Sequence, residues 1–219
     1  MGGCLVFLLL AAGAVCSQQS PIDESEAFAL QLVDAPAQQR EELLAGHPKL
    51  ITIELRKALV RRANGLFVTE KYAPAFELYR LAQRVAQQIG DKEGLAETAL
   101  NIGSVYYSQG KHGLAVDSYR QAQELFTALA NRSEAARSVF GLALTYQAQQ
   151  KLPEALESFK QALSEFETLH DANEIANTLA AIGGIQYAQG NYDAAAKTFL
   201  RAASPVSYTH LTLPTNREV

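Results

Sequence analysis

The sequence predicts an all-α protein, a right-handed α-solenoid built from helix-turn-helix units. Alanine and aromatic residues recur with a period of 40 residues through the middle of the chain. Within each period, apolar residues follow the spacing of amphipathic helices, and glycine or polar residues stand where turns are needed. One helical pair cannot bury its apolar face alone, so stacked pairs are expected to share a continuous core.

Composition agrees with a globular chain and argues against several functional classes. The 219 residues are 48% hydrophobic and 19% charged, and the formal net charge is −4. This balance offers no basic surface for phosphates, so nucleic acid is not an expected partner. The two cysteines, Cys4 and Cys16, both precede the repeats. That position excludes a disulfide framework, a cysteine zinc site and a thiol nucleophile within the repeats.

Residues 1–17 are typical of a signal peptide. Residues 5–15 form a short apolar run, and Ala12 and Ala14 give an A-x-A-like cleavage pattern. No Lys or Arg precedes the run, which is unusual for a signal. Cys16 is also a candidate for lipid attachment, although Val15 departs from the small residue preferred before it. We therefore expect an exported protein, periplasmic, envelope-associated or secreted; the alternative is a buried amino-terminal helix of a cytosolic protein.

Residues 18–52 are expected to cap the array. Short helices are predicted over residues 23–33 and 36–45, with helix-start signals at Ser25 and Asp34. The His47-Pro48 pair interrupts the chain before the repeats. Such helices would cover the first repeat, whose apolar face would otherwise contact water.

Four units occupy residues 53–204, the last of them truncated. In the second copy, helices are predicted over residues 93–109 and 113–130, with Gly110 between them. Gln150 and Gly190 mark the same turn in later copies, and Arg62 replaces an apolar residue in the first copy, as in a degenerate or capping repeat. The small and aromatic residues expected to define the core of the repeats are Ala75, Tyr79, Ala82, Gly103, Tyr106, Ala115, Tyr119, Ala122, Ala143, Tyr146, Ala155, Phe159, Ala162, Gly183, Ala195, Phe199 and Ala202.

The set Gly103, Tyr106, Ala115, Tyr119 and Ala122 resembles the tetratricopeptide repeat. The resemblance covers about two-thirds of the chain, with 40-residue units where 34 residues are usual. Units of this length resemble those of kinesin-light-chain-like proteins and of bacterial CHAT-associated repeat proteins. The resemblance implies a concave groove, lined by the first helix of each pair, that holds an extended peptide or a partner helix. The CHAT likeness implies a caspase-like peptidase domain after the repeats.

The groove residues that the resemblance implies come from all four copies. Three aromatic residues, Phe67, Tyr107 and Tyr187, form a column interrupted by Gln147, and they are expected either to contact peptide or to pack against the next helix. The candidate peptide-binding residues are Lys57, Arg61, Asn64, Phe67, Glu97, Asn101, Ser104, Tyr107, Arg137, Phe140, Leu144, Gln147, Asn177, Gly184 and Tyr187.

Residues 205–219 are interpreted as an artefact. The stretch VSYTHLTLPT, residues 206–215, is similar to a translated sequencing adapter. We therefore expect the natural chain to continue beyond Ser204 into a further domain, which is itself a candidate partner of the repeats. The alternative is that these residues form a genuine polar tail of the protein.

No catalytic constellation is present in the sequence. Phosphate-loop, zinc-protease and nucleophile-elbow motifs are absent, and His47, His112 and His170 fall at turns. The chain as given is therefore expected to be no enzyme and to need no cofactor or metal.

The sequence alone leaves three hypotheses about function open. The first is an exported scaffold that binds a protein or peptide, as the amino-terminal fragment of a larger protein. The second is the recognition or regulatory half of a CHAT-type peptidase. The third is an envelope assembly scaffold, anchored through lipid at Cys16. A cofactor-binding helical protein is less favoured, because no pocket-forming motif supports it.

Overall fold

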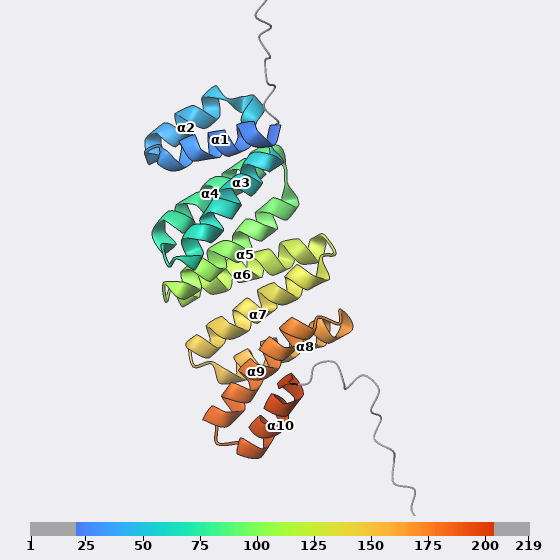
Figure 1. Cartoon of the computed structure of the whole chain (residues 1–219). Coiled ribbons are helices and arrows are strands. Elements are labelled where there is room, and N and C mark those ends of the chain that lie inside the picture. The colour runs from blue at the N-terminus through green and yellow to red at the C-terminus, as the bar shows by residue number, and fades with distance from the viewer. Residues whose placement is uncertain (1–20, 204–219) are drawn as a thin grey trace, which may run out of the picture.

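The computed structural model describes residues 21–203, which form a stack of helices that runs from one end of the molecule to the other (Figure 1). No strand occurs within this range, so the all-α solenoid prediction is confirmed. The predicted signal segment (1–17) and the predicted artefact (205–219) lie outside the described residues. The elements are α1 (Pro21–Asp34), α2 (Ala37–Gly46), η1 (Pro48–Leu50), α3 (Ile53–Val68), α4 (Tyr72–Ile89), α5 (Lys92–Ser108), α6 (His112–Ala128), α7 (Arg132–Ala148), α8 (Leu152–Thr168), α9 (Ala172–Ala188) and α10 (Tyr192–Ala203).

Four helical pairs make up the repeats: α3 with α4, α5 with α6, α7 with α8, and α9 with α10. The first helix of each later pair begins with a side-chain cap. Asp91, Asn131 and Asp171 accept hydrogen bonds from backbone N–H groups three residues on, at 2.8, 3.2 and 3.1 Å. These caps satisfy amide groups that a helix start leaves unpaired. The polar residues predicted between repeats therefore fix where each pair begins.

Every turn between the helices α3 to α10 contains one residue in the left-handed conformation, spaced 20 residues apart. The turns predicted at Gly110, Gln150 and Gly190 are confirmed, with φ of 71°, 61° and 79°. Glycine adopts this conformation without steric cost, whereas Gln150 and Ala130 (φ 55°) do so against the crowding of Cβ. The turn geometry is thus repeated even where the residue type is not favourable.

The predicted helix boundaries are close to those of the structure, with specific differences. Helix α5 starts at Lys92 because Asp91 caps it, one residue earlier than expected, and α6 ends at Ala128. Two predicted start signals are wrong. Ser25 lies inside α1 and is buried, and α2 begins after Pro36 with no side-chain cap from Asp34.

The predicted repeat-defining residues are buried, with four exceptions. Tyr106, Tyr146 and Ala202 are half-buried, and Phe199 is 41% exposed. The aromatic residues of the second helices lie between successive first helices. A Cβ atom added to Gly103 or to Gly141 would approach the Tyr119 ring to 2.8 or 2.6 Å. The ring therefore occupies space that only glycine leaves free at these points.

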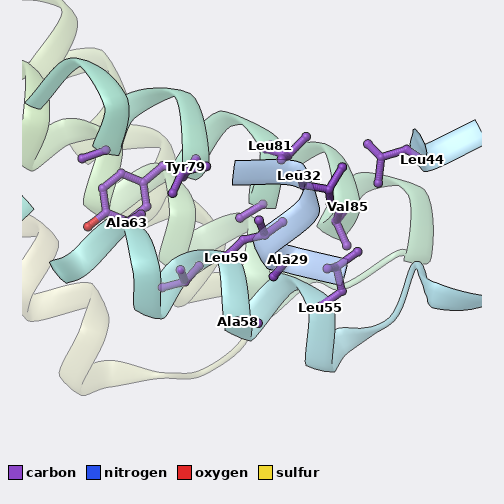
Figure 2. Packing of buried hydrophobic residues seen from close by; sticks show 14 of the residues in the cluster. Ala29, Leu32, Leu44, Leu55, Ala58, Leu59, Ala63, Tyr79, Leu81 and Val85 are labelled. Carbon is purple, nitrogen blue, oxygen red and sulfur yellow. The ribbon is translucent and has the colours of Figure 1, made fainter. Parts of the chain in front are cut away.

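Helix α1 packs against α3 at the start of the array. Ala29 and Leu32 of α1 lie among Leu55, Leu59 and Val85 of the first repeat (Figure 2). Their exposed fractions are all 0%. The contact removes the first repeat's apolar face from water.

Ion pairs add to the contact between α1 and α3. Glu26 of α1 pairs with Arg61 and, at 3.1 Å, with Arg62. The hydrogen bond from Arg61 lowers the pKa of Glu26. Arg62 replaces the apolar residue of the other copies at the place where α1 supplies a carboxylate.

Candidate functional site

A cleft of about 780 Å³ runs along the first helices of the repeats. Its walls come from α3, α5 and α7, with Glu174 from α9, and Tyr119 and Phe126 of α6 also line it. The remaining lining residues are Arg56, Lys57, Asn64, Glu93, Glu97, Leu100, Asn101, Ser104, Asn131, Glu134, Arg137, Phe140, Gly141 and Leu144. We call this cleft the groove.

Part of the predicted binding set lies in the groove. The structure brings together Lys57, Asn64, Glu97, Asn101, Ser104, Arg137, Phe140 and Leu144. They come from three helices far apart in sequence, which the solenoid aligns side by side.

The predicted aromatic column is not part of the groove lining. Each of its rings contacts the side chain five residues further along the chain, at the start of the second helix of the same repeat. The ring centroids of Phe67 and Tyr72 are 5.5 Å apart, and those of Tyr187 and Tyr192 are 5.2 Å apart. Tyr107 lies 6.1 Å from His112 in the same way. These rings therefore pack across the turn within the first, second and fourth repeats.

The other predicted residues outside the groove have different surroundings. Arg61 pairs with Glu26 of α1, and Asn177 donates a long hydrogen bond of 3.5 Å to Glu174. Gln147 and Gly184 are half-buried and do not line the groove.

Sequence reasoning missed a row of charged residues one helical turn nearer the amino-terminal ends of these helices. Glu93, Glu134 and Glu174 lie in the first turns of α5, α7 and α9. All three line the groove, as does Arg56 of α3. The recurrence of an acidic residue two or three positions after each Asx cap is a signal that was present in the sequence.

Two ion-pair networks fix the charges of the groove. Arg56 is buried and lies 3.0 Å from Asp91, and it also pairs with Glu97. Arg137 lies 3.2 Å from Glu134 of its own helix and 3.4 Å from Glu174 of the next repeat. Lys57, in contrast, forms no ion pair with any residue of the described range 21–203. Its side chain is exposed.

Two tyrosine hydroxyl groups reach groove residues from the second helices. Tyr79 donates to Asn64 Oδ1 at 2.6 Å, and Tyr119 donates to Ser104 Oγ at 3.2 Å. Burial raises the pKa of both Tyr79 and Tyr119 to about 12. Both rings therefore stay neutral at physiological pH, and they act as hydrogen-bond donors that orient the groove side chains.

Within residues 21–203, no group of three His, Cys, Asp or Glu side chains is arranged to hold a metal ion. None of the helices in that range is both long and apolar enough to cross a bilayer. His47 accompanies the end of α2, His112 begins α6, and His170 occupies the left-handed turn before α9. None of these three histidines lines the groove, whose side chains offer amide, hydroxyl, charged and aromatic contacts.

Comparison with known proteins places this geometry in a family. The tetratricopeptide repeat family matches residues 54–128 and 133–204. A sequence search of curated proteins finds no match. The crystal structure of BtubC (BKLC) from P. vanneervenii is similar over 92% of this chain and 97% of its own, with 17% identity and a TM-score of 0.64.

Two other solved structures share the fold over a longer chain. The Rap conjugation gene regulator of plasmid pLS20, solved in complex with the Phr* peptide, has 20% identity and a TM-score of 0.63. Aspartyl phosphate phosphatase F from Bacillus subtilis has 17% identity and a TM-score of 0.66. The chain spans 44% and 54% of their respective lengths. Since the family match covers well over half of the residues, and the helical pairs repeat in the same register, the chain belongs to the tetratricopeptide repeat family.

Proposed function

We propose that the chain is a scaffold that binds a peptide or an extended segment of a partner protein in the groove. The observation that carries the proposal is the groove itself, which combines free polar groups with apolar floor residues over three successive repeats. Such a mixture suits a peptide, whose backbone needs hydrogen bonds and whose side chains need apolar contact.

Specific groups are free to make these contacts. Asn101 is half-buried, and its side chain has no hydrogen-bond partner within the described residues. The Asn64 amide accepts from Tyr79 through Oδ1, which leaves its NH₂ group as a donor. Phe140 and Leu144 supply apolar area beside them. The Rap regulator of pLS20, with a similar fold, was solved with a bound peptide, and this supports the same use here.

The proposal is tested by selecting peptides from a random library on the full 219-residue chain and measuring their affinity by fluorescence anisotropy. Asn101→Ala should weaken a selected peptide by about tenfold, the value of one or two hydrogen bonds. Lys57→Glu should weaken peptides that carry an acidic residue and reduce their salt dependence. Gln121→Ala and Lys160→Glu, exposed on the second helices, are matched controls that should leave affinity unchanged. Equal losses in groove and control variants would contradict the proposal.

The finer proposal is that this scaffold is exported and is the amino-terminal part of a larger protein. The apolar run at residues 5–15 supports export, and the adapter-like stretch at 206–215 supports a natural chain that differs after Ser204. Mass spectrometry of the mature amino terminus tests export and lipidation together, because a diacylglyceryl group on Cys16 has a distinctive mass. An amino terminus at Met1 or Gly2 in purified native protein would overturn export.

A second candidate is the recognition half of a CHAT-type caspase-like peptidase. The 40-residue period and the signal-like start support it. Long-read sequencing of the source locus across the Ser204 codon tests it directly. A frame that continues into a domain with a Cys/His pair would support it, and a frame that contains residues 206–219 and stops would exclude it.

A further inference from the structure

One position of the first helices carries charges of alternating sign along the groove. Lys57 on α3, Glu97 on α5 and Arg137 on α7 are spaced 40 residues apart, and all three line the groove. The structure shows what the third of them does, and this comparison gives the second a meaning.

At the junction between the third and fourth repeats, an arginine bridges two carboxylates. Arg137 Nε lies 3.4 Å from Glu174 Oε1 of α9, and Arg137 Nη1 lies 3.2 Å from Glu134 Oε1 of its own helix. A guanidinium group presents five N–H donors in a planar fork, so one arginine can serve two acidic side chains.

The preceding junction, between the second and third repeats, lacks this cation. The residues 40 positions before Arg137 and Glu174 are Glu97 and Glu134. They belong to α5 and α7, which are in contact, and both line the groove. Two acidic side chains therefore occupy the positions at which the next junction has an ion pair. Since like charges repel, this junction favours a cation supplied by a ligand.

The chain's own arginines use only part of these two carboxylates. Arg56 pairs with Oε2 of Glu97, and Arg137 pairs with Oε1 of Glu134. The other oxygen of each carboxylate accepts no hydrogen bond from any side chain or backbone group of residues 21–203. The side chains of Glu97 and Glu134 are 40% and 29% exposed, so a ligand can reach them.

The charge of the whole groove has the same sign. The lining side chains, together with Asp91 that pairs with Arg56, include three cations and five carboxylates. A basic ligand would therefore reduce an excess of negative charge, whereas an acidic one would add to it.

Apolar residues beside the two carboxylates suit the stem of a long basic side chain. Leu100 follows Glu97 by three residues on α5, and Phe140 occupies the same position on α7. Both are half-buried and line the groove. Residues three apart on a helix are neighbours on its surface. An arginine can thus pack its methylene groups on apolar surface while its charged end meets carboxylates.

We infer that the groove takes an extended partner segment that carries an arginine, with the guanidinium group between Glu97 and Glu134. The guanidinium group would supply at this junction the cation that Arg137 supplies at the next one. The inference rests on the proposed function and names the side chain by which the partner is selected. Lys57 lies one helix further along, on α3, so an acidic residue elsewhere in the same segment is compatible with it.

The experiment selects peptides from a random library on the full 219-residue chain. The selected peptides should share an arginine. Replacing that arginine with citrulline, which has nearly the same shape and no charge, should weaken binding about tenfold by fluorescence anisotropy. A selection that yields no binding peptide would contradict the proposed function. Binding peptides that share no arginine would leave the proposed function intact and overturn this inference.

Variants of the chain locate the arginine within the groove. On a Glu97→Gln/Glu134→Gln double variant, the citrulline replacement should weaken binding less than about threefold, because the charged partners are gone. Glu124→Gln, exposed on α6, is the matched control and should keep the tenfold loss. The same tenfold loss on the double variant would overturn the site.

A single variant keeps the test decisive if the double variant does not fold. Glu97 holds the buried Arg56, whereas Glu134 pairs with the exposed Arg137. Glu134→Gln alone should therefore fold, and it should reduce the effect of citrulline to about threefold. An undiminished tenfold loss on this variant would overturn the site in the same way.

Discussion

The first two repeats and the last two differ in the aromatic residue of the second helix and in the residue of the first helix at the matching position. In the first two, a tyrosine of the second helix donates to a polar residue of the first helix, Tyr79 to Asn64 and Tyr119 to Ser104. At the same positions the third repeat has Phe159 with Leu144, and the fourth has Phe199 with Gly184. The tyrosine hydroxyl and its hydrogen-bond acceptor are therefore both present in the first two repeats and both absent from the last two.

This pairing follows from the cost of burying an unpaired hydroxyl group. Tyr79 and Tyr119 are almost completely buried, with exposed fractions of 2% and 5%. A buried hydroxyl without a partner costs about 1–3 kcal/mol, whereas a satisfied one is close to neutral. The two positions are therefore expected to change together, and the groove lining has Asn64 and Ser104 in α3 and α5 but Leu144 at the same position in α7.

The largest expected loss of stability distinguishes the third repeat from the fourth, which both have phenylalanine at this position. Phe159→Ala should lower the free energy of unfolding by about 3–5 kcal/mol, because the ring is fully buried and packs against Phe140 at 5.4 Å. Phe199→Ala should cost about 1 kcal/mol, because that ring is 41% exposed. Urea unfolding followed by circular dichroism measures both. Equal losses would show that the repeats are packed alike.

Introducing the tyrosine and its acceptor into the third repeat tests whether the two residues depend on each other. Phe159→Tyr should cost about 1–3 kcal/mol, because Leu144 offers no acceptor to the new hydroxyl. Adding Leu144→Asn should recover much of that loss by recreating the Asn64–Tyr79 pair. A double variant no more stable than the single one would show that the acceptor is not what permits tyrosine.

Glycines beside Tyr119 should be intolerant of a methyl group. Gly141→Ala should cost about 1–3 kcal/mol, because its Cβ would lie 2.6 Å from the ring. Gly65→Ala in α3 is the control, with no atom within 4 Å of the new Cβ. That variant should gain up to about 1 kcal/mol from helix propensity. Thermal unfolding of both variants compares them, and a stable Gly141→Ala would contradict the close contact.

The last test is the dependence of stability on alkaline pH. The pKa of Tyr79 and of Tyr119 is about 12 in the folded chain, against 10.0 ordinarily. Their contribution to stability is therefore complete below about pH 10 and is lost as the pH rises towards 12, since the unfolded chain releases these protons first. A Tyr79→Phe/Tyr119→Phe double variant should lose less stability over this interval than the original chain. Parallel curves would assign the alkaline loss to other groups.

Several features of this protein follow from the sequence by itself. Local spacing alone predicts the 40-residue period, the helical pairs and the turns at Gly110, Gln150 and Gly190. It also predicts most of the buried small and aromatic positions. Local propensity and amphipathic pattern act within one helix and its adjoining turns. Eight of the groove residues could be placed through the resemblance to the tetratricopeptide repeat, which assigns the concave face to the first helix of each pair.

Only the tertiary structure decided how that face is used. The groove extends one helical turn nearer the helix starts than expected, and the aromatic column packs at the turns. The burial of Arg56, which pairs with Asp91 and Glu97, likewise arises between repeats. Such features depend on the angle between successive pairs and on the side-chain volumes of three helices at once. That information is distributed over residues about 40 positions apart, and it is fixed only when the repeats stack.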